Sequence, residues 1–220
     1  MDKTLGDLLD KVCEKSNHKE IIMSVYKKLL LCVAFLSLAG CATKMLPTQQ
    51  AVEDRHIGNL KIDELTQSKQ YAISAAHLNV PPETVFAKVS DHKNLRDWVP
   101  MIDHLVEVDH SKSVTPGQPN VGTVRICDFG GDTLVEDIRY WQEGVGYAYS
   151  VRDSDDVAVT DHLGVMWIES DQKGGSYLVW RQFFEKKPWS LKAQIMPLMM
   201  AYVMDNAMEN LVEEWGGEVL

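Results

Sequence analysis

Six strand-like segments joined by short turns fill the middle of this chain, and they limit the possible folds more than any other feature. They are residues 105–109, 123–129, 134–141, 146–153, 163–170 and 177–184. The loops between them contain Pro116-Gly117, Gly130-Gly131, Glu143-Gly144 and Gly174-Gly175. Such pairs at these spacings are typical of hairpins, so the six segments predict an antiparallel meander.

A seventh strand and two short helices are expected before this meander. Residues 71–80 alternate small or polar with apolar side chains, which predicts a strand that ends at Pro81-Pro82. The next residues begin a helix, because Val85, Phe86 and Val89 lie at helical spacing. A second short helix follows and ends at Pro100.

One long amphipathic helix is expected after the meander, beginning near Ser190. Its apolar stripe comprises Met200, Val203, Met204, Ala207, Met208, Leu211 and Trp215. Pro197 interrupts the pattern, so we expect a kink or a late start there. Gly216-Gly217 is the expected stop.

This order of elements predicts an α+β fold of the helix-grip type. A seven-stranded antiparallel curved sheet would surround the long C-terminal helix, with the two short helices after the first strand. Residues 71–217 resemble the START-like (SRPBCC) superfamily, and within it the polyketide cyclase/dehydratase-like group. The residues that carry the resemblance are Leu78, Val80, Pro81, Pro82, Glu83, Val85, Phe86, Val89, Asp91, Leu95, Trp98, Pro100, Gly122, Arg125, Glu136, Tyr147, Tyr149 and Trp180.

The resemblance implies a cavity between helix and sheet that binds a hydrophobic small molecule, such as a lipid or a polyketide-like compound. Aromatic side chains at alternate strand positions and methionines on the last helix would line it. The expected ligand-binding residues are Trp98, Tyr147, Tyr149, Trp167, Trp180, Phe184, Met199, Met200 and Val203. A solid core is the alternative, because any sheet packed on a helix shows stripes of aromatic residues and methionines. Alternation also separates the two faces of a strand without identifying the inner one.

Catalysis in such a cavity would need a buried charged or titratable side chain, and Arg125 and Glu136 are the main candidates. The wider set is Arg125, Asp128, Glu136, Asp137, Arg139 and His162. The alternative is that these side chains face water or pair across the outer surface of the sheet. The histidines show no ligand spacing, and there is no phosphate loop or dinucleotide motif, so we expect no metal and no cofactor.

Three functions therefore stay open. The first is a non-catalytic protein that binds or carries a hydrophobic small molecule. The second is a cyclase or dehydratase-type enzyme that uses the same cavity. The third is an accessory protein that binds another protein, which predicts a filled core and an exposed apolar patch.

The N-terminal segment resembles a bacterial lipoprotein signal. An apolar run from Leu29 to Leu38 follows Lys27 and Lys28, and it is too short to span a bilayer. Leu38-Ala39-Gly40-Cys41 resembles a lipobox, which implies that Cys41 carries the lipid and becomes the mature N-terminus. Ala42 after it favours the periplasmic face of the outer membrane, if the source is Gram-negative. A buried core helix ending on a free cysteine is the alternative.

This interpretation divides the chain into three segments: a signal segment over 1–40 with the lipobox at 38–41, a linker over 41–70 and a START-like ligand-binding domain over 71–217. A short turn of helix is expected near 62–65. Residues 1–22 are unusually acidic for a signal, so Met23 is the expected true start, with a short amphipathic helix as the alternative. The net charge of −10 gives no attraction to phosphate backbones, so we expect no nucleic-acid partner.

Overall fold

The computed structural model describes residues 55–155, 157–188 and 190–220. The predictions for the signal segment, Met23, the lipidated Cys41 and the first part of the linker fall outside these residues. The described residues belong to one compact unit, Leu46–Leu220. Within them, no helix is both long and apolar enough to cross a membrane.

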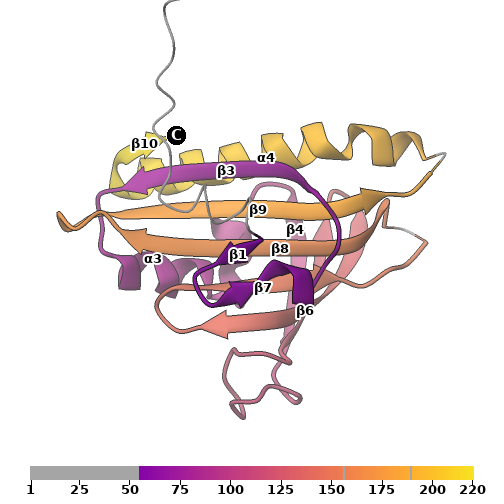
Figure 1. The fold of residues 1–220 in the computed structure, drawn as a ribbon, viewed down its shortest axis with the longest axis horizontal. Helices are drawn as coiled ribbons and strands as arrows, with labels where there is room; N and C mark the ends of the chain where they lie inside the picture. The colour runs from indigo at the N-terminus through magenta and orange to yellow at the C-terminus, as the bar shows by residue number, and fades with distance from the viewer. Residues whose placement is uncertain (1–54, 156, 189) are drawn as a thin grey trace, which may run out of the picture. The chain divides into compact units, whose positions relative to one another are not determined.

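The fold is the predicted helix grip: a large antiparallel curved sheet with one long C-terminal helix (Figure 1). The seven predicted strands and one further strand form this sheet, in the order β10-β3-β9-β8-β7-β6-β5-β4. The strands of this sheet are β3 (Gln70–Leu78), β4 (Ile102–Asp109), β5 (Val124–Phe129), β6 (Asp132–Gln142), β7 (Gly146–Val151), β8 (Val159–Ser170), β9 (Ser176–Lys186) and β10 (Gly217–Val219).

Strand β10 is an addition to the predicted seven, and it explains why two glycines end the chain's last helix. Gly217 pairs with Leu78 at the edge of the sheet, and its φ of 122° is rarely adopted by other residues. A Cβ at this position would also overlap the carbonyl oxygen of His77. The chain therefore turns directly from the helix into an edge strand.

The sheet bends because several of its strands contain irregular steps. The register shifts within β3, β4, β6 and β8. At each shift the strand has one or two residues more than its partner over the same stretch. Such bulges bend a strand and increase its local twist. The bent sheet leaves space between its inner face and the long C-terminal helix.

Helix α4 (Leu191–Trp215) runs along β3 and β9, as Figure 1 shows. It begins after Ser190, whose Oγ accepts a hydrogen bond from the backbone N–H of Ala193. Pro197 lies inside the helix, so the late start suggested for this position is wrong. At this position the proline removes the hydrogen bond that a backbone N–H would donate to the carbonyl oxygen of Ala193, at the cavity end of the helix.

Two short helical segments follow β3 and close one end of the sheet, as predicted. They are α3 (Pro82–Val89) and the 3-10 helix η2 (His92–Asp97). Val85, Phe86 and Val89 are buried in the same core as the C-terminal half of α4. Asn210 on α4 donates a hydrogen bond of 3.0 Å to the carbonyl oxygen of Trp98, which fixes the end of η2 against the long helix.

The outer face of the sheet carries a second, smaller core. A hairpin of β1 (His56–Ile57) and β2 (Leu60–Lys61), followed by the 3-10 helix η1 (Ile62–Glu64), lies over β7 and β8 (Figure 1). Its apolar side chains pack on Ala148, Leu163, Val165, Trp167 and Phe183. The expected helical turn near 62–65 is η1.

The prediction of a linker over 41–70 is wrong for its described part, which is packed on the sheet. Ile57, Leu60 and Ile62 are buried against the outer face because that face exposes large apolar side chains that must be covered. Three apolar residues within six positions are too few to show a periodicity. The dipeptide Gly58-Asn59, which is typical of a two-residue hairpin turn, is the one local signal of this hairpin.

Candidate ligand-binding cavity

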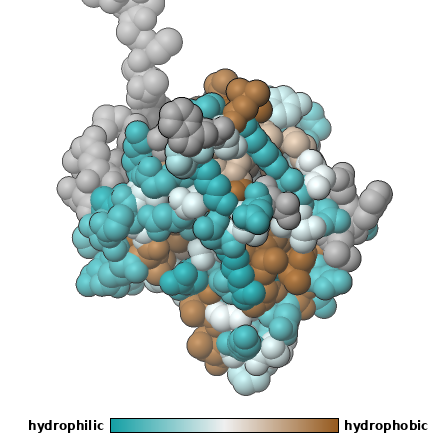
Figure 2. All heavy atoms as spheres, turned by 90° about the vertical axis from the view of Figure 1, so that its right-hand side faces the viewer, coloured by the Kyte–Doolittle hydropathy of each residue, from teal (hydrophilic) through white to brown (hydrophobic). Residues whose placement is uncertain are grey.

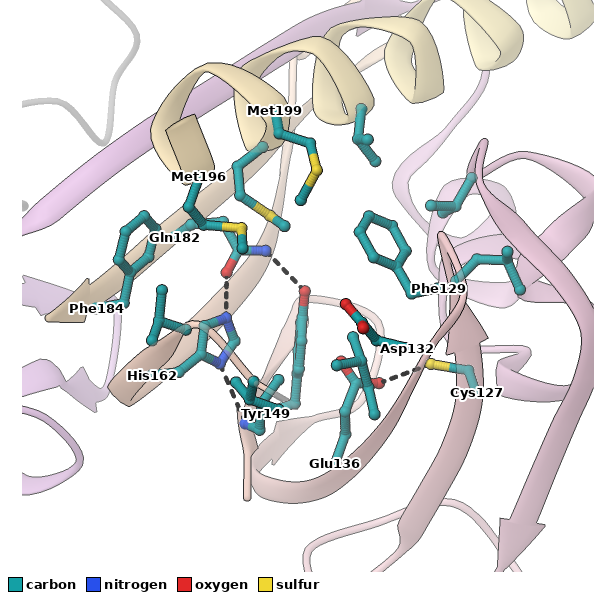
Figure 3. Close-up of a pocket in the computed structure, with 18 of the residues that line it drawn as sticks. Cys127, Phe129, Asp132, Glu136, Tyr149, His162, Gln182, Phe184, Met196 and Met199 are labelled. Carbon is teal, nitrogen blue, oxygen red and sulfur yellow. Dashed lines mark hydrogen bonds between the residues drawn. The ribbon is translucent and has the colours of Figure 1, made fainter. Parts of the chain in front are cut away.

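A cavity lies between the inner face of the sheet and the N-terminal half of α4 (Figure 3). Its empty space, including the part open to solvent at the mouth, is about 870 Å³. Binding cavities for small organic molecules are likewise mostly apolar. The apolar lining residues are Leu95, Trp98, Val99, Ile102, Cys127, Phe129, Leu134, Tyr147, Tyr149, Val151, Val157, Ala158, Val159, Met166, Trp180, Phe184, Met196, Met199, Met200 and Val203.

Most of the residues expected to bind a ligand line this cavity. They come from η2, β7, β9 and α4, and they are Trp98, Tyr147, Tyr149, Trp180, Phe184, Met199, Met200 and Val203. Their contact with a ligand stays a prediction. The cavity itself argues against the solid core that was the alternative, and against the filled core expected of a protein-binding accessory.

Trp167 does not line the cavity, so its assignment to the site is wrong. On β8 it lies on the outer face under the β1–β2 hairpin, whereas its neighbour Met166 faces inward. A Cβ on Gly58 of the hairpin would overlap the Trp167 ring. Alternation separates the two faces of β8 without identifying the inner one, and the aromatic side chain lies on the outer face.

Arg125 and Glu136 form a buried ion pair in the cavity wall. They are cross-strand neighbours on β5 and β6, with exposed fractions of 2% and 5%. The alternative that this pair faces water is therefore wrong. By contrast, Asp137 pairs with Arg152 on the solvent side, and Asp128 accepts a hydrogen bond from Thr133 at an exposed position.

Several contacts hold Arg125 as a charged group. Burial alone would lower its pKa, but the carboxylate of Glu136 and the neighbouring tyrosines outweigh this effect and raise the pKa above its usual value. Its guanidinium lies 4.8 Å from the ring centroid of Tyr149. It also donates to Nδ1 of His92 at 3.2 Å, and burial followed by the Arg125 charge lowers the pKa of His92.

Cys127 and His162 also line the cavity, and both are neutral. Burial, and next the charge of Glu136, raise the pKa of the Cys127 thiol, so this side chain is not a thiolate nucleophile at neutral pH. Burial lowers the pKa of His162, which leaves its imidazole uncharged. Among the described residues no three His, Cys, Asp or Glu side chains gather as metal ligands would.

Tyr149 lies across the sheet and reaches β9 because Gly164 leaves room for its ring. Gly164 is its partner on β8, and a Cβ there would overlap the ring. Its hydroxyl accepts hydrogen bonds from Nε2 of Gln182 at 2.9 Å and from Nε1 of Trp180 at 3.1 Å. Nε2 of His162 lies 2.6 Å from Oε1 of Gln182. His162, Gln182 and Tyr149 thus form a chain of hydrogen bonds, which Figure 3 shows.

Tyr147 has a different role from Tyr149, although the two are two residues apart on the same face. Its hydroxyl donates to the carbonyl oxygen of Val89 at 2.8 Å, and its ring stacks on Trp141. This bond satisfies the hydroxyl within the protein and fixes the end of α3. Tyr147 thus supplies apolar surface to the cavity.

Sequence reasoning missed part of the wall. Gln182 could have been found, because it lies between Trp180 and Phe184 on the same face of β9. Met196 also lines the cavity, and it could have been found as one of the methionines on the last helix. Asp132 and Lys192, which form an ion pair in the wall, lie at the starts of β6 and α4 and belong to no sequence pattern.

The comparisons with known proteins agree with this geometry. Residues 72–215 match the family described as polyketide cyclase / dehydrase and lipid transport. No curated protein matches this chain in sequence. Among solved structures, XoxI from Bacillus cereus has a TM-score of 0.52 at 18% identity, covering 66% of this chain and 94% of that one.

A second solved structure has the same fold. An uncharacterized protein from Bacillus thuringiensis has a TM-score of 0.50 at 18% identity, covering 65% of this chain and 96% of that one. At this identity the two structures support the fold alone. The family match covers most of the described residues, and it includes the strands and the helix that form the cavity. This chain belongs to the polyketide cyclase / dehydrase and lipid transport family.

Proposed function

We propose that this protein binds or carries a hydrophobic small molecule, such as a lipid or a polyketide-like compound, without transforming it. The observation that carries the proposal is the cavity under the N-terminal half of α4, whose wall is mostly apolar. No side chain in that wall is an activated nucleophile, because the Cys127 thiol and the His162 imidazole are both neutral. Flexible methionines on the helix side suit ligands of more than one shape.

The proposal includes attachment to a membrane through Cys41. The apolar run before Cys41 and the small residues around it support lipidation, which would hold the protein at the periplasmic face of the outer membrane. Intact mass of protein extracted from its own membrane should show acyl chains on Cys41. A Cys41→Ser variant should appear in the soluble fraction, and a variant that stays in the membrane would contradict the tether.

Binding is tested with a matched pair of variants on α4. Met199 lines the cavity, whereas its neighbour Leu198 is 76% exposed on the other side of the helix. Met199→Trp should fill the cavity and abolish binding of 2-ethylnaphthalene measured by calorimetry, while Leu198→Trp should leave binding unchanged. Native mass spectrometry of wild-type protein from its own membrane should also show a bound molecule. Equal binding by both variants would contradict the proposal.

A cyclase or dehydratase activity is the second candidate, because the buried pair of Arg125 and Glu136 borders the cavity. The test is dehydration of an aromatic β-hydroxy ketone to its enone, followed by absorbance. Replacing both charges, Arg125→Met with Glu136→Gln, avoids leaving one buried charge without its partner. An enzyme should lose its activity in this double variant. A binder should show only the uncatalysed rate in both proteins.

A further inference from the structure

The hydroxyl of Tyr149 has a hydrogen that no group in the described part of the chain accepts. Trp180 Nε1 is only a donor, so it occupies one lone pair of the hydroxyl oxygen. The second lone pair accepts from Gln182, provided that the amide nitrogen of Gln182 faces Tyr149. The orientation of that amide therefore decides whether the Tyr149 hydrogen is available.

His162 fixes the amide of Gln182. The backbone N–H of Val151 donates to Nδ1 of His162 at 3.1 Å, so Nδ1 has no hydrogen and the neutral ring carries its hydrogen on Nε2. This Nε2–H donates to Oε1 of Gln182, which turns the amide nitrogen toward Tyr149. Both lone pairs of the tyrosine oxygen are thus occupied, and its own hydrogen stays free to donate.

The free hydrogen belongs to a hydroxyl that points into the cavity. Figure 3 shows Tyr149 rising from the sheet with its oxygen directed toward α4 and the space below Met199. Burial keeps the pKa of this hydroxyl above its ordinary value, so it remains a donor at any neutral pH. A ligand in the cavity would meet a single, fixed O–H.

Trp98, which also lines the cavity, has a second donor without an acceptor in the described part of the chain. Its side chain is 2% exposed, and its Nε1 has no hydrogen-bond partner among the described residues. The ring centroids of Trp98 and Trp180 are 5.9 Å apart, which places Trp98 next to the side chain that bonds to Tyr149. A buried N–H without an acceptor is costly, and a ligand oxygen would remove that cost.

The charges in the wall cancel. Arg125 pairs with Glu136, and Lys192 pairs with Asp132 at the mouth. A ligand anion would therefore lose its hydration without gaining an unpaired cation, which makes burial of a carboxylate unfavourable. Neutral molecules avoid this cost.

We propose that the ligand class is a neutral apolar molecule with a carbonyl group, whose oxygen accepts the hydrogen of Tyr149 in the cavity. This inference rests on the proposed binding function and gives it a chemical class. A carbonyl oxygen accepts without donating, and its two lone pairs match a wall that offers the donors of Tyr149 and Trp98. His162 and Gln182 act through Tyr149 and are positioning residues.

The experiment uses three probes of one shape: 2-acetylnaphthalene, 2-ethylnaphthalene and 2-naphthoate. Infrared spectra of wild-type protein with carbonyl-labelled 2-acetylnaphthalene should show the bound C=O stretch at lower frequency than in hexane, as a single narrow band. Calorimetry at pH 8 should show that the ketone binds at least tenfold more tightly than 2-naphthoate. Tyr149→Phe should weaken ketone binding about tenfold, and should weaken 2-ethylnaphthalene binding by a much smaller factor.

Each arm has an outcome that overturns the inference. A bound ketone with the stretching frequency found in hexane would show that no donor reaches it, and this holds even if Tyr149→Phe does not fold. Tight binding of 2-naphthoate would contradict the neutral class. Failure of 2-ethylnaphthalene to bind wild-type protein would overturn the proposed function itself, whereas its binding alongside an unshifted ketone band would overturn this inference alone.

Discussion

The two halves of α4 carry the same kinds of side chain but perform different tasks. In the C-terminal half, Met204, Ala207, Met208 and Leu211 are fully buried in the main core. In the N-terminal half, the inward methionines Met196, Met199 and Met200 line the cavity. One helix thus serves as a structural element at one end and as the roof of a binding site at the other.

The difference teaches that a methionine stripe does not by itself indicate a binding site. Met204 and Met208 pack in the main core together with α3, whereas the three methionines of the N-terminal half line the cavity. The N-terminal half of the helix is also apolar on its outer side, where Leu191, Leu198 and Tyr202 are exposed. On the face shown in Figure 2, hydrophobic surface appears as separate patches within a mainly hydrophilic surface.

The largest effect on stability is expected at the cavity end, from Glu136→Gln. The change leaves the buried charge of Arg125 without its anion, which should lower the free energy of unfolding by about 3–5 kcal/mol. The matched control is Asp137→Asn, the next residue, whose pair with Arg152 is at the surface and should contribute at most about 1 kcal/mol. Urea denaturation measures both, and equal losses would mean that the Arg125 pair is hydrated.

The next prediction compares the two halves of the helix directly. Leu211→Ala should cost about 2–5 kcal/mol, because the deleted atoms leave a void in a closed core. Met199→Ala should cost clearly less than Leu211→Ala, since the Met199 side chain is only partly buried and already borders the cavity. The measurement is again urea denaturation. If Met199→Ala proved as damaging as Leu211→Ala, the distinction between the two halves would be wrong.

A smaller loss is expected from Gly164→Ala on β8. The added methyl group would overlap the ring of Tyr149 and should cost about 1–3 kcal/mol by forcing the ring to move. The double variant Tyr149→Phe with Gly164→Ala should be no more stable than Gly164→Ala, because the added methyl group overlaps the ring and not only the hydroxyl. Thermal unfolding of both variants checks this. Full wild-type stability of Gly164→Ala would show that the ring does not lie over Gly164.

The smallest effect is a pH dependence from the two buried histidines at the cavity end. Burial lowers the pKa of both His92 and His162 below 6.5. The unfolded chain therefore binds more protons than the folded protein below pH 6.5, so the free energy of unfolding falls as the pH falls. We expect a loss of about 1 kcal/mol between pH 7.5 and pH 6. NMR titration of both imidazoles should give midpoints below pH 6.5, and an ordinary titration near pH 6.5 would disprove their burial.

Most of the fold could be predicted because its elements have long, regular patterns. The strands of the meander alternate and end at glycine turns, and α4 has a continuous apolar stripe. The β1–β2 hairpin lacks such a pattern, since its burial depends on the apolar outer face of strands far along the chain. Contacts with the sheet, rather than the local preferences of its residues, decide where this hairpin lies.

The site could be predicted only in part, for a physical reason. Alternation places Trp180 and Phe184 on one face of β9, but it does not say which face is inner, and on β8 this made Trp167 an error. The same alternation made Gln182 available to prediction. The orientation of the Tyr149 hydrogen depends on a chain of bonds through three strands, which no sequence pattern contains.

The most direct test of the difference between the two halves of α4 is methyl NMR of protein labelled at its methionine methyl groups. On titration with 2-ethylnaphthalene, the signals of Met196, Met199 and Met200 should shift most, because these side chains line the cavity. The signals of Met204 and Met208, buried in the closed core, should stay in place. No shift in the first group, or equal shifts in both groups, would contradict a binding cavity confined to the N-terminal half of the helix.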